Sequence, residues 1–224
     1  MKIISNILSF FLLAVLFTGC GLDNYEEPQS KLMGKVTYNG ETLGLRGTNE
    51  SVQLQIYQDG YAKHDPVAVY VNQDGTFEAM LFDGEYKLVT RNNNGPWVND
   101  RDTVLVNVKG STDCEVEVTP YFTISNESIS LSGNTVNASL SINKIVSTAT
   151  VSSVMLLVSK TAFVDEGTYI ARQNLTTGAI GASTLSLDLS NNTDVAKATQ
   201  LYARIGVKAT GADQAIYSDV VKIK

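Results

Sequence analysis

Apolar and polar residues alternate in short runs along most of the chain, and turn dipeptides separate the runs. Val52–Tyr57 has a period of two and is followed by Asp59-Gly60, and Thr76–Phe82 is followed by Asp83-Gly84. Alternation of this kind places every second side chain on one face of a strand, and Asp-Gly or Asn-Gly favours a tight turn. The pattern predicts seven strands before residue 121: Leu32–Tyr38, Val52–Tyr57, Val67–Val71, Thr76–Phe82, Tyr86–Thr90, Val104–Val108 and Cys114–Thr119.

From Tyr121 the chain is richer in Ser, Thr, Ala and Asn, and it nearly lacks proline. Seven further strands are predicted there: Thr123–Ile129, Thr135–Ile142, Val151–Ser159, Thr168–Ala171, Thr184–Asp188, Gln200–Ala209 and Ala215–Ile223. Seven short strands in about a hundred residues are typical of an immunoglobulin or fibronectin-type sandwich. No helical periodicity of 3.6 residues interrupts either half. We therefore expect an all-β chain of two tandem β-sandwiches, residues 31–120 and residues 121–224.

A different pattern occupies the first twenty residues. Lys2 precedes the nearly uncharged run Ile7–Phe17, and small residues lead to Cys20. A cationic start, an apolar run of about a dozen residues and small residues at the end predict a secretory signal over residues 1–19. The run is shorter than the roughly 20 apolar residues that span a bilayer. Its end resembles the bacterial lipobox, which implies that Cys20 is acylated and holds the protein at a membrane; an ordinary cleaved signal is the alternative.

Residues 20–30 are acidic and contain little apolar material, so they predict a solvated tether. Asp23, Glu26 and Glu27 lie just past the lipobox cysteine. This acidic cluster resembles the surface-export signal of Bacteroidetes lipoproteins. The resemblance implies a lipid anchor in the outer membrane with the protein facing the cell exterior. The alternative is a charged linker that is not a signal for export.

Composition narrows the possible chemistry. The net charge of the 224 residues is −6, which offers no electrostatic attraction for nucleic acid. Two cysteines and one histidine are too few for a zinc finger, an iron–sulfur cluster or a disulfide scaffold. The oxygen-rich segments Asn72–Asp74 and Asn99–Asp102 match no EF-hand loop. We expect no metal and no cofactor.

The sequence also predicts a protein without catalytic activity. A serine triad needs a histidine base, and the one histidine, His64, lies in a polar loop of a chain without a Gly-x-Ser-x-Gly elbow. Cys114 shares its strand parity with Val116 and Val118, so we expect a core residue and no disulfide. Aspartates beside glycines, such as Asp59 and Asp83, are explained by turn chemistry.

Two resemblances are carried by particular residues. Gly34–Val36, Asp74–Phe77 and Phe82–Leu88 resemble the carboxypeptidase-regulatory, transthyretin-like domain. The whole chain resembles a family of two-domain Bacteroides lipoproteins of unassigned function through Asp23–Tyr25, Ile56–Tyr61, Asn94–Trp97 and Val118–Phe122. Genes of that family accompany outer-membrane importers in polysaccharide-utilisation clusters. The resemblance therefore implies an accessory in nutrient capture, and it supplies no binding residue.

Aromatic side chains beside polar loops are the best candidates for ligand contact, because sugars and peptides dock on exposed aromatic faces. Trp97 follows a loop that contains Asn93 and Asn94, and Tyr57 and Tyr61 flank Asp59-Gly60. We predict a glycan platform on the first domain formed by Trp97, Asn93, Asn94 and Tyr61. The alternative for this residue is that Trp97 closes the core of the sandwich. For the whole chain, a separate alternative is a protein-interaction or structural module that packs on importer proteins and has no ligand of its own.

Overall fold

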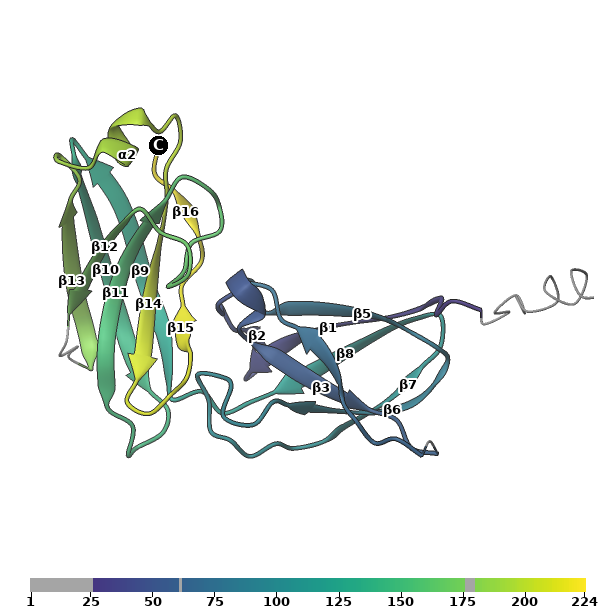
Figure 1. The fold of residues 1–224 in the computed structure, drawn as a ribbon. Coiled ribbons are helices and arrows are strands. Elements are labelled where there is room, and N and C mark those ends of the chain that lie inside the picture. Colours follow the sequence, from purple (N-terminus) through teal and green to yellow (C-terminus); the bar gives the residue numbers. More distant parts are fainter. Residues whose placement is uncertain (1–25, 61, 176–179) are drawn as a thin grey trace, which may run out of the picture.

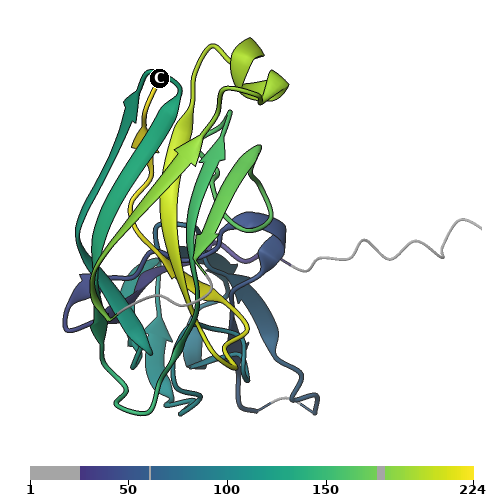
Figure 2. The ribbon, with the colours of Figure 1, turned by 90° about the vertical axis from the view of Figure 1, so that its left-hand side faces the viewer.

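The computed structural model describes residues 26–60, 62–175 and 180–224, which form two β-sandwiches (Figure 1). The long axis of the first sandwich crosses that of the second, and the first sandwich abuts the side of the second near one end. A view from the second sandwich shows its two sheets standing over the first domain (Figure 2). The expected all-β chain of two tandem sandwiches is confirmed.

The first sandwich pairs two four-stranded sheets. In one, the central strand β1 is antiparallel to β2 and β5 and parallel to β8, and in the other the order is β4-β3-β6-β7. Asn39 and Gly40 both have positive φ, so the predicted Asn-Gly turn joins β1 to β2. The strands are β1 Ser30–Tyr38, β2 Glu41–Thr42, β3 Gln53–Tyr57, β4 Val67–Tyr70, β5 Thr76–Leu81, β6 Gly84–Thr90, β7 Val104–Val108 and β8 Ser111–Glu117; a 3-10 turn, η1, spans Thr48–Glu50.

The second sandwich has sheet orders β13-β10-β9 and β12-β11-β14-β15, with β16 also pairing with β14. Because β15 and β16 pair with different stretches of β14, they fill one strand position, and the result is the three-plus-four arrangement of a fibronectin type III domain. None of the helices in the described part of the chain is long and apolar enough to span a membrane. The elements are β9 Phe122–Ser132, β10 Thr135–Lys144, β11 Val151–Ser159, β12 Ala171–Leu175, β13 Gly181–Asp188, α2 Thr193–Lys197, β14 Tyr202–Ala209, β15 Ala215–Tyr217 and β16 Val221–Lys222.

Two of the predicted strands are displaced or divided in the structure, and nearby hydrogen bonds explain both differences. The strand expected at Thr168–Ala171 lies at Ala171–Leu175, since Asp165 and Thr168 first close a tight turn. The strand expected at Ala215–Ile223 is broken in two at Ser218, whose hydroxyl accepts a hydrogen bond from the Ile205 amide at 3.1 Å. A hydroxyl that replaces a ladder partner interrupts regular pairing.

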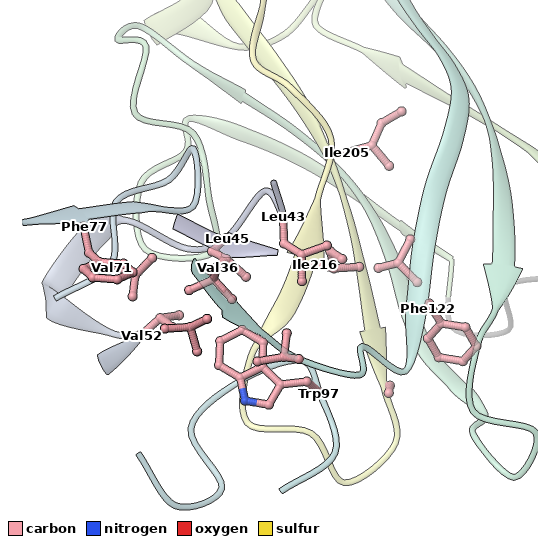
Figure 3. Close-up of a cluster of buried hydrophobic side chains, with 14 of the residues drawn as sticks. Val36, Leu43, Leu45, Val52, Val71, Phe77, Trp97, Phe122, Ile205 and Ile216 are labelled. Atoms are coloured by element: carbon pink, nitrogen blue, oxygen red, sulfur yellow. The ribbon is translucent and has the colours of Figure 1, made fainter. Parts of the chain in front are cut away.

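Buried side chains of the two sandwiches form one continuous core. Leu43 and Leu45 of the first domain lie close to Ile216 of the second, and Trp97 lies below them (Figure 3). The strands β11 and β14 are buried on both faces: Leu156 and Ile205 face the sandwich core, whereas a second cluster packs on the other side of the sheet. That second cluster consists of Met155, Leu157, Val164, Ala215 and Tyr217.

Arg204 joins the two domains through hydrogen bonds to backbone carbonyls. It lies on β14 with 2% of its surface exposed, and its Nε donates to Ser218 O at 2.6 Å. From the same guanidinium, Nη1 donates to Leu45 O at 2.9 Å and Nη2 to Gln73 O at 2.7 Å, both in the first domain. Burial lowers the pKa of Arg204 to about 10, so the group stays charged at neutral pH.

Further contacts around Arg204 fix the orientation of the domains. The fully buried carboxylate of Asp165 accepts from Thr48 Oγ1 at 2.6 Å and from the Thr48 amide at 3.1 Å. The Tyr217 amide donates to Gly44 O at 2.9 Å, and a Cβ at position 44 would lie 2.3 Å from Tyr217 O. This close backbone approach requires glycine at 44. The two sandwiches are thus held by polar bonds as well as by apolar packing.

We predict that Arg204→Met lowers the free energy of unfolding by about 3 kcal/mol, because buried carbonyls of both domains lose their donor. Urea denaturation followed by circular dichroism measures the loss. With the junction weakened, the single transition should separate into one transition for each sandwich. Lys222→Met, an exposed change on the same sheet, is the control and should leave the curve unchanged; equal curves for both variants would contradict the role of Arg204.

Candidate functional site

The predicted glycan platform around Trp97 is wrong, because the indole is inside the first domain. Trp97 is 4% exposed and pairs through its backbone with Pro120. The backbone at Gly95 lies so close to the ring that a Cβ there would be 2.1 Å from it. Trp97 therefore closes the core between the end of the loop and the start of the second domain, which is the alternative that the sequence left open.

The amides of the same loop have structural partners. Asn94 is buried; its Oδ1 accepts from the Gln53 amide at 2.8 Å, and its Nδ2 donates to Ser51 O at 2.8 Å. Asn93 is exposed with φ 47°, and its amide donates to Asn99 Oδ1 at 2.9 Å. Asn94 thus anchors the loop to β3, and only Asn93 faces solvent. Two other predicted residues, Tyr61 and the lipidation residue Cys20, lie outside the described residues.

A different face of the first domain brings aromatic and polar side chains together. On β3, Gln53, Gln55 and Tyr57 alternate with the buried Leu54 and Ile56, so the first three point away from the core. Tyr70 lies opposite Gln53 in the neighbouring strand β4 and therefore points to the same side. We call this outer surface of the β4-β3-β6-β7 sheet the open face; its members are Gln53, Gln55, Tyr57, Tyr70, Arg91 and Arg101.

Hydrogen bonds order the side chains of the open face. Arg91 Nη1 donates to Gln53 Oε1 at 2.8 Å, and Arg101 Nη2 donates to Gln55 Oε1 at 2.9 Å. A further bond of 3.2 Å runs from Arg101 Nε to Thr90 O. Each guanidinium has five N–H donors, so both arginines keep donors for a ligand. The two glutamines are held by charged donors, which reduces the side-chain entropy that binding would remove.

Tyr70 extends the open face at the edge of the sheet. Its side chain is 42% exposed, and a hydrogen bond to the Glu50 carboxylate raises the pKa of its hydroxyl. The ring therefore presents an apolar surface while the hydroxyl is fixed at one end. Tyrosine in this arrangement offers both a stacking surface and a polar group.

A hollow of about 460 Å³ lies at the other end of the same sheet. The ion pair between Lys87 Nζ and Asp59 Oδ2, 2.6 Å apart, crosses it, and Leu105 and Asn107 border it. Tyr57 lies opposite Lys87, and Lys87 lies opposite Leu105, so all three side chains point to the same side of the sheet. The hollow is therefore on the same side as the open face and next to it. The face and its hollow form one shallow surface of aromatic, amide and charged groups.

A second hollow, of about 400 Å³, lies between the two domains. The β1–β2 turn borders it on one side and the irregular part of β9 on the other, where Asn126 has positive φ. Its charged side chains are Glu41, Glu127 and Asp219, without a lysine or an arginine. Compared with the open face, it contains fewer exposed aromatic groups and no charged hydrogen-bond donor.

The residues tested for catalysis or metal binding stay apart. His64 is exposed in the loop between β3 and β4. No group of three or more His, Cys, Asp or Glu that could hold a metal ion occurs in residues 26–60, 62–175 and 180–224.

The sequence contained a signal for part of the open face. The alternation Gln53-x-Gln55-x-Tyr57 places three side chains outward, on the face opposite to the buried Leu54 and Ile56. No sequence pattern predicts that Arg101 belongs to the open face, because its position over β3 depends on how residues 91–103 fold back across the sheet. A loop side chain can be placed only when the tertiary fold is known.

The chain belongs to the DUF3823 family. The model of its N-terminal domain, described as a protein of unknown function, matches residues 30–119, and the model of the C-terminal domain, a domain of unknown function, matches residues 122–222. A DUF3823 family protein from Parabacteroides merdae is 58% identical with a TM-score of 0.86, covering 89% of this chain and 100% of its own. Another from Bacteroides ovatus is 33% identical with a TM-score of 0.79, covering 87% and 98%.

A more distant structure carries a functional description. It is a "putative carbohydrate binding protein" from Bacteroides uniformis, 21% identical with a TM-score of 0.73, and the match covers 88% of this chain and 99% of that one. At this identity the similarity shows the fold alone. Among curated proteins, none matches the chain.

Cys114 provides a test of the packing behind the first sheet. Cys114 is half-buried on β8 and packs against the core. Desolvation raises the pKa of its thiol from 9.0 to about 11, and the charge of Asp113 makes a smaller contribution. At pH 8 the folded chain should therefore react with iodoacetamide about a hundredfold more slowly than the chain unfolded in urea, because the thiolate is the reacting form. Mass spectrometry of timed samples measures both rates, and equal rates would contradict the burial of this thiol.

Proposed function

We propose that this DUF3823 protein is a cell-surface lipoprotein that binds carbohydrate without catalysis, as an accessory to nutrient capture at an outer-membrane importer. The observation that carries the proposal is the open face, on which two tyrosines lie beside glutamines held by arginines. The carbohydrate binding named for the Bacteroides uniformis relative of the same fold supports it.

The chemistry of the open face suits a sugar. The C–H groups of a pyranose ring pack on an aromatic face, and Tyr70 is an exposed aromatic residue of this sheet. Sugar hydroxyls both donate and accept hydrogen bonds, and the glutamines and arginines provide partners for both roles. Since Arg91 and Arg101 already fix Gln53 and Gln55, a ligand would meet an ordered surface. The open face is shallow, which suits one side of an extended polysaccharide.

The proposed location follows from the N-terminal sequence. Acylation of Cys20 after removal of residues 1–19 would anchor the chain, and the acidic segment that follows would direct it to the outer surface. One lipid chain gives marginal membrane binding and several give stable anchoring. An anchored binding protein beside an importer raises the local concentration of its ligand there.

A second candidate function is a protein-interaction module that packs on the importer and binds no glycan. Phe163 and Tyr169 favour it, because both are exposed in the segment between β11 and β12 of the second sandwich. Exposed aromatic side chains are enriched at protein interfaces. Co-purification from native outer membranes would identify such a partner.

We predict that Tyr70→Ala weakens the affinity for the glycan by tenfold or more, because the stacking surface is lost. A glycan array first identifies the ligand of the parent protein, and isothermal calorimetry then compares the variants. Tyr169→Ala is the matched control, since Tyr169 is 44% exposed but lies on the second domain. Gln53→Ala and Gln55→Ala should also weaken binding.

Two results would contradict carbohydrate binding at the open face. One is a parent protein that binds no glycan on the array, and the other is unchanged affinity in Tyr70→Ala. Equal losses in Tyr70→Ala and Tyr169→Ala would place the site elsewhere.

A further inference from the structure

One end of the first sandwich points away from the second domain, and the chain enters the fold there (Figure 1). The Ser30 hydroxyl donates to the Asp83 carboxylate, and the Gly110 amide donates to Ser30 Oγ at 2.9 Å. The start of β1, the β5–β6 turn and the β7–β8 turn therefore meet at this end. We call it the distal tip, with residues Ser30, Lys31, Phe82–Gly84, Lys109 and Gly110.

Two exposed apolar side chains lie at or next to the distal tip. Phe82 is in the β5–β6 turn with 45% of its surface exposed, and Met80, two residues before it and opposite Lys31, is 54% exposed. Two other exposed apolar residues, Leu105 and Val67, lie on opposite faces of the second sheet, because Leu105 pairs with Lys87 and Val67 with the buried Ile56. Phe82 and Met80 are therefore the apolar contact that the tip itself offers, and exposed apolar groups that lie together mark contact surfaces.

Two lysines near the tip form ion pairs on the protein surface, and the tip carboxylate, Asp83, is hydrogen-bonded. Lys31 Nζ lies 2.6 Å from Glu78 Oε2, and Lys87 Nζ lies 2.6 Å from Asp59 Oδ2. Asp83 accepts from the Ser30 hydroxyl and the Gly110 amide, which lowers the pKa of its carboxyl. Binding through this end would therefore depend on apolar contact more than on attraction to an anionic surface.

We infer that the distal tip docks on the lipid surface to which the chain is anchored, with Phe82 and Met80 entering the interfacial region of the bilayer. This rests on the proposed acylation of Cys20. Nine residues lie between Cys20 and Ser30, and the ten steps from one Cα to the next span at most about 35 Å when extended. Because the tether joins the fold at the tip itself, the bilayer is the surface that Phe82 meets at the highest effective concentration.

Docking of the tip would determine how the rest of the molecule is presented. The Arg204 junction fixes the second sandwich to the first, so both would take one orientation on the membrane. Tyr70 pairs with Gln53 at the end of the sheet away from the tip, so this part of the open face would stand clear of the lipid.

Fluorescence quenching in vesicles tests the inference. The acylated protein is reconstituted into phosphatidylcholine vesicles with brominated acyl chains, in the variants Phe82→Trp and Phe163→Trp. Phe163 is the matched control because it is 58% exposed on the second sandwich, and the buried Trp97 gives the same background in both. We expect the brominated lipid to remove at least half of the added emission of Phe82→Trp and none of that of Phe163→Trp. Raising the salt concentration should change neither result.

Failure of docking and failure of anchoring give different results. If mass spectrometry finds Cys20 without lipid, the anchor is wrong, and the mature chain is then tethered through an N-terminal histidine tag to a nickel-chelating lipid. In either form, no quenching of Phe82→Trp, or equal quenching at both positions, overturns docking. Crosslinking of the tip to an importer protein in the absence of vesicle quenching would also overturn it, in favour of a protein partner. None of these results bears on glycan binding at the open face, which calorimetry measures separately.

Discussion

The hydrogen bonds of the buried Arg204 guanidinium to carbonyls of both domains are the constraint on which the arrangement of this molecule depends. A buried charged group needs protein acceptors for its donors, and Leu45 O, Gln73 O and Ser218 O, from two domains, accept from all three nitrogen atoms of this guanidinium. Tyr217 packs against the guanidinium with its ring centroid 4.7 Å away. Separating the sandwiches would expose apolar surface and leave these groups unpaired. The two domains therefore act as one body.

Bonds within the protein also explain the role of the loop before β7. The side chains of this loop hold it in place, and the open face lies beside it. Trp97 and Asn94 attach the loop to the core and to β3, and the chain that continues from them places Arg101 over Gln55. The residues that looked suited to a ligand are those that position the loop. The surface that we propose for a ligand is formed instead by Gln53, Gln55 and Tyr70, whose backbone is fixed by regular strand pairing.

Local rules predicted much of the fold from the sequence. Val104–Val108 and Val151–Ser159 have the predicted bounds because alternation or an apolar run ends at a clear break. The predictions failed where a distant side chain intervened, as where Ser218 divides the last strand. Trp97 was misplaced for a related reason: an indole beside asparagines has the same sequence whether it faces solvent or closes a core.

The sequence by itself determined the strand pattern, the division into two sandwiches and the outward direction of Gln53, Gln55 and Tyr57, because strand alternation is a local property. Only the tertiary structure decided that Arg204 joins the domains, that Trp97 is buried, and that Arg91 and Arg101 lie over the glutamines of β3. It also brought Ser30, Phe82 and Gly110 to one end of the molecule. These are contacts between residues far apart in the chain, and the closing of two sheets over a shared core is what sets them.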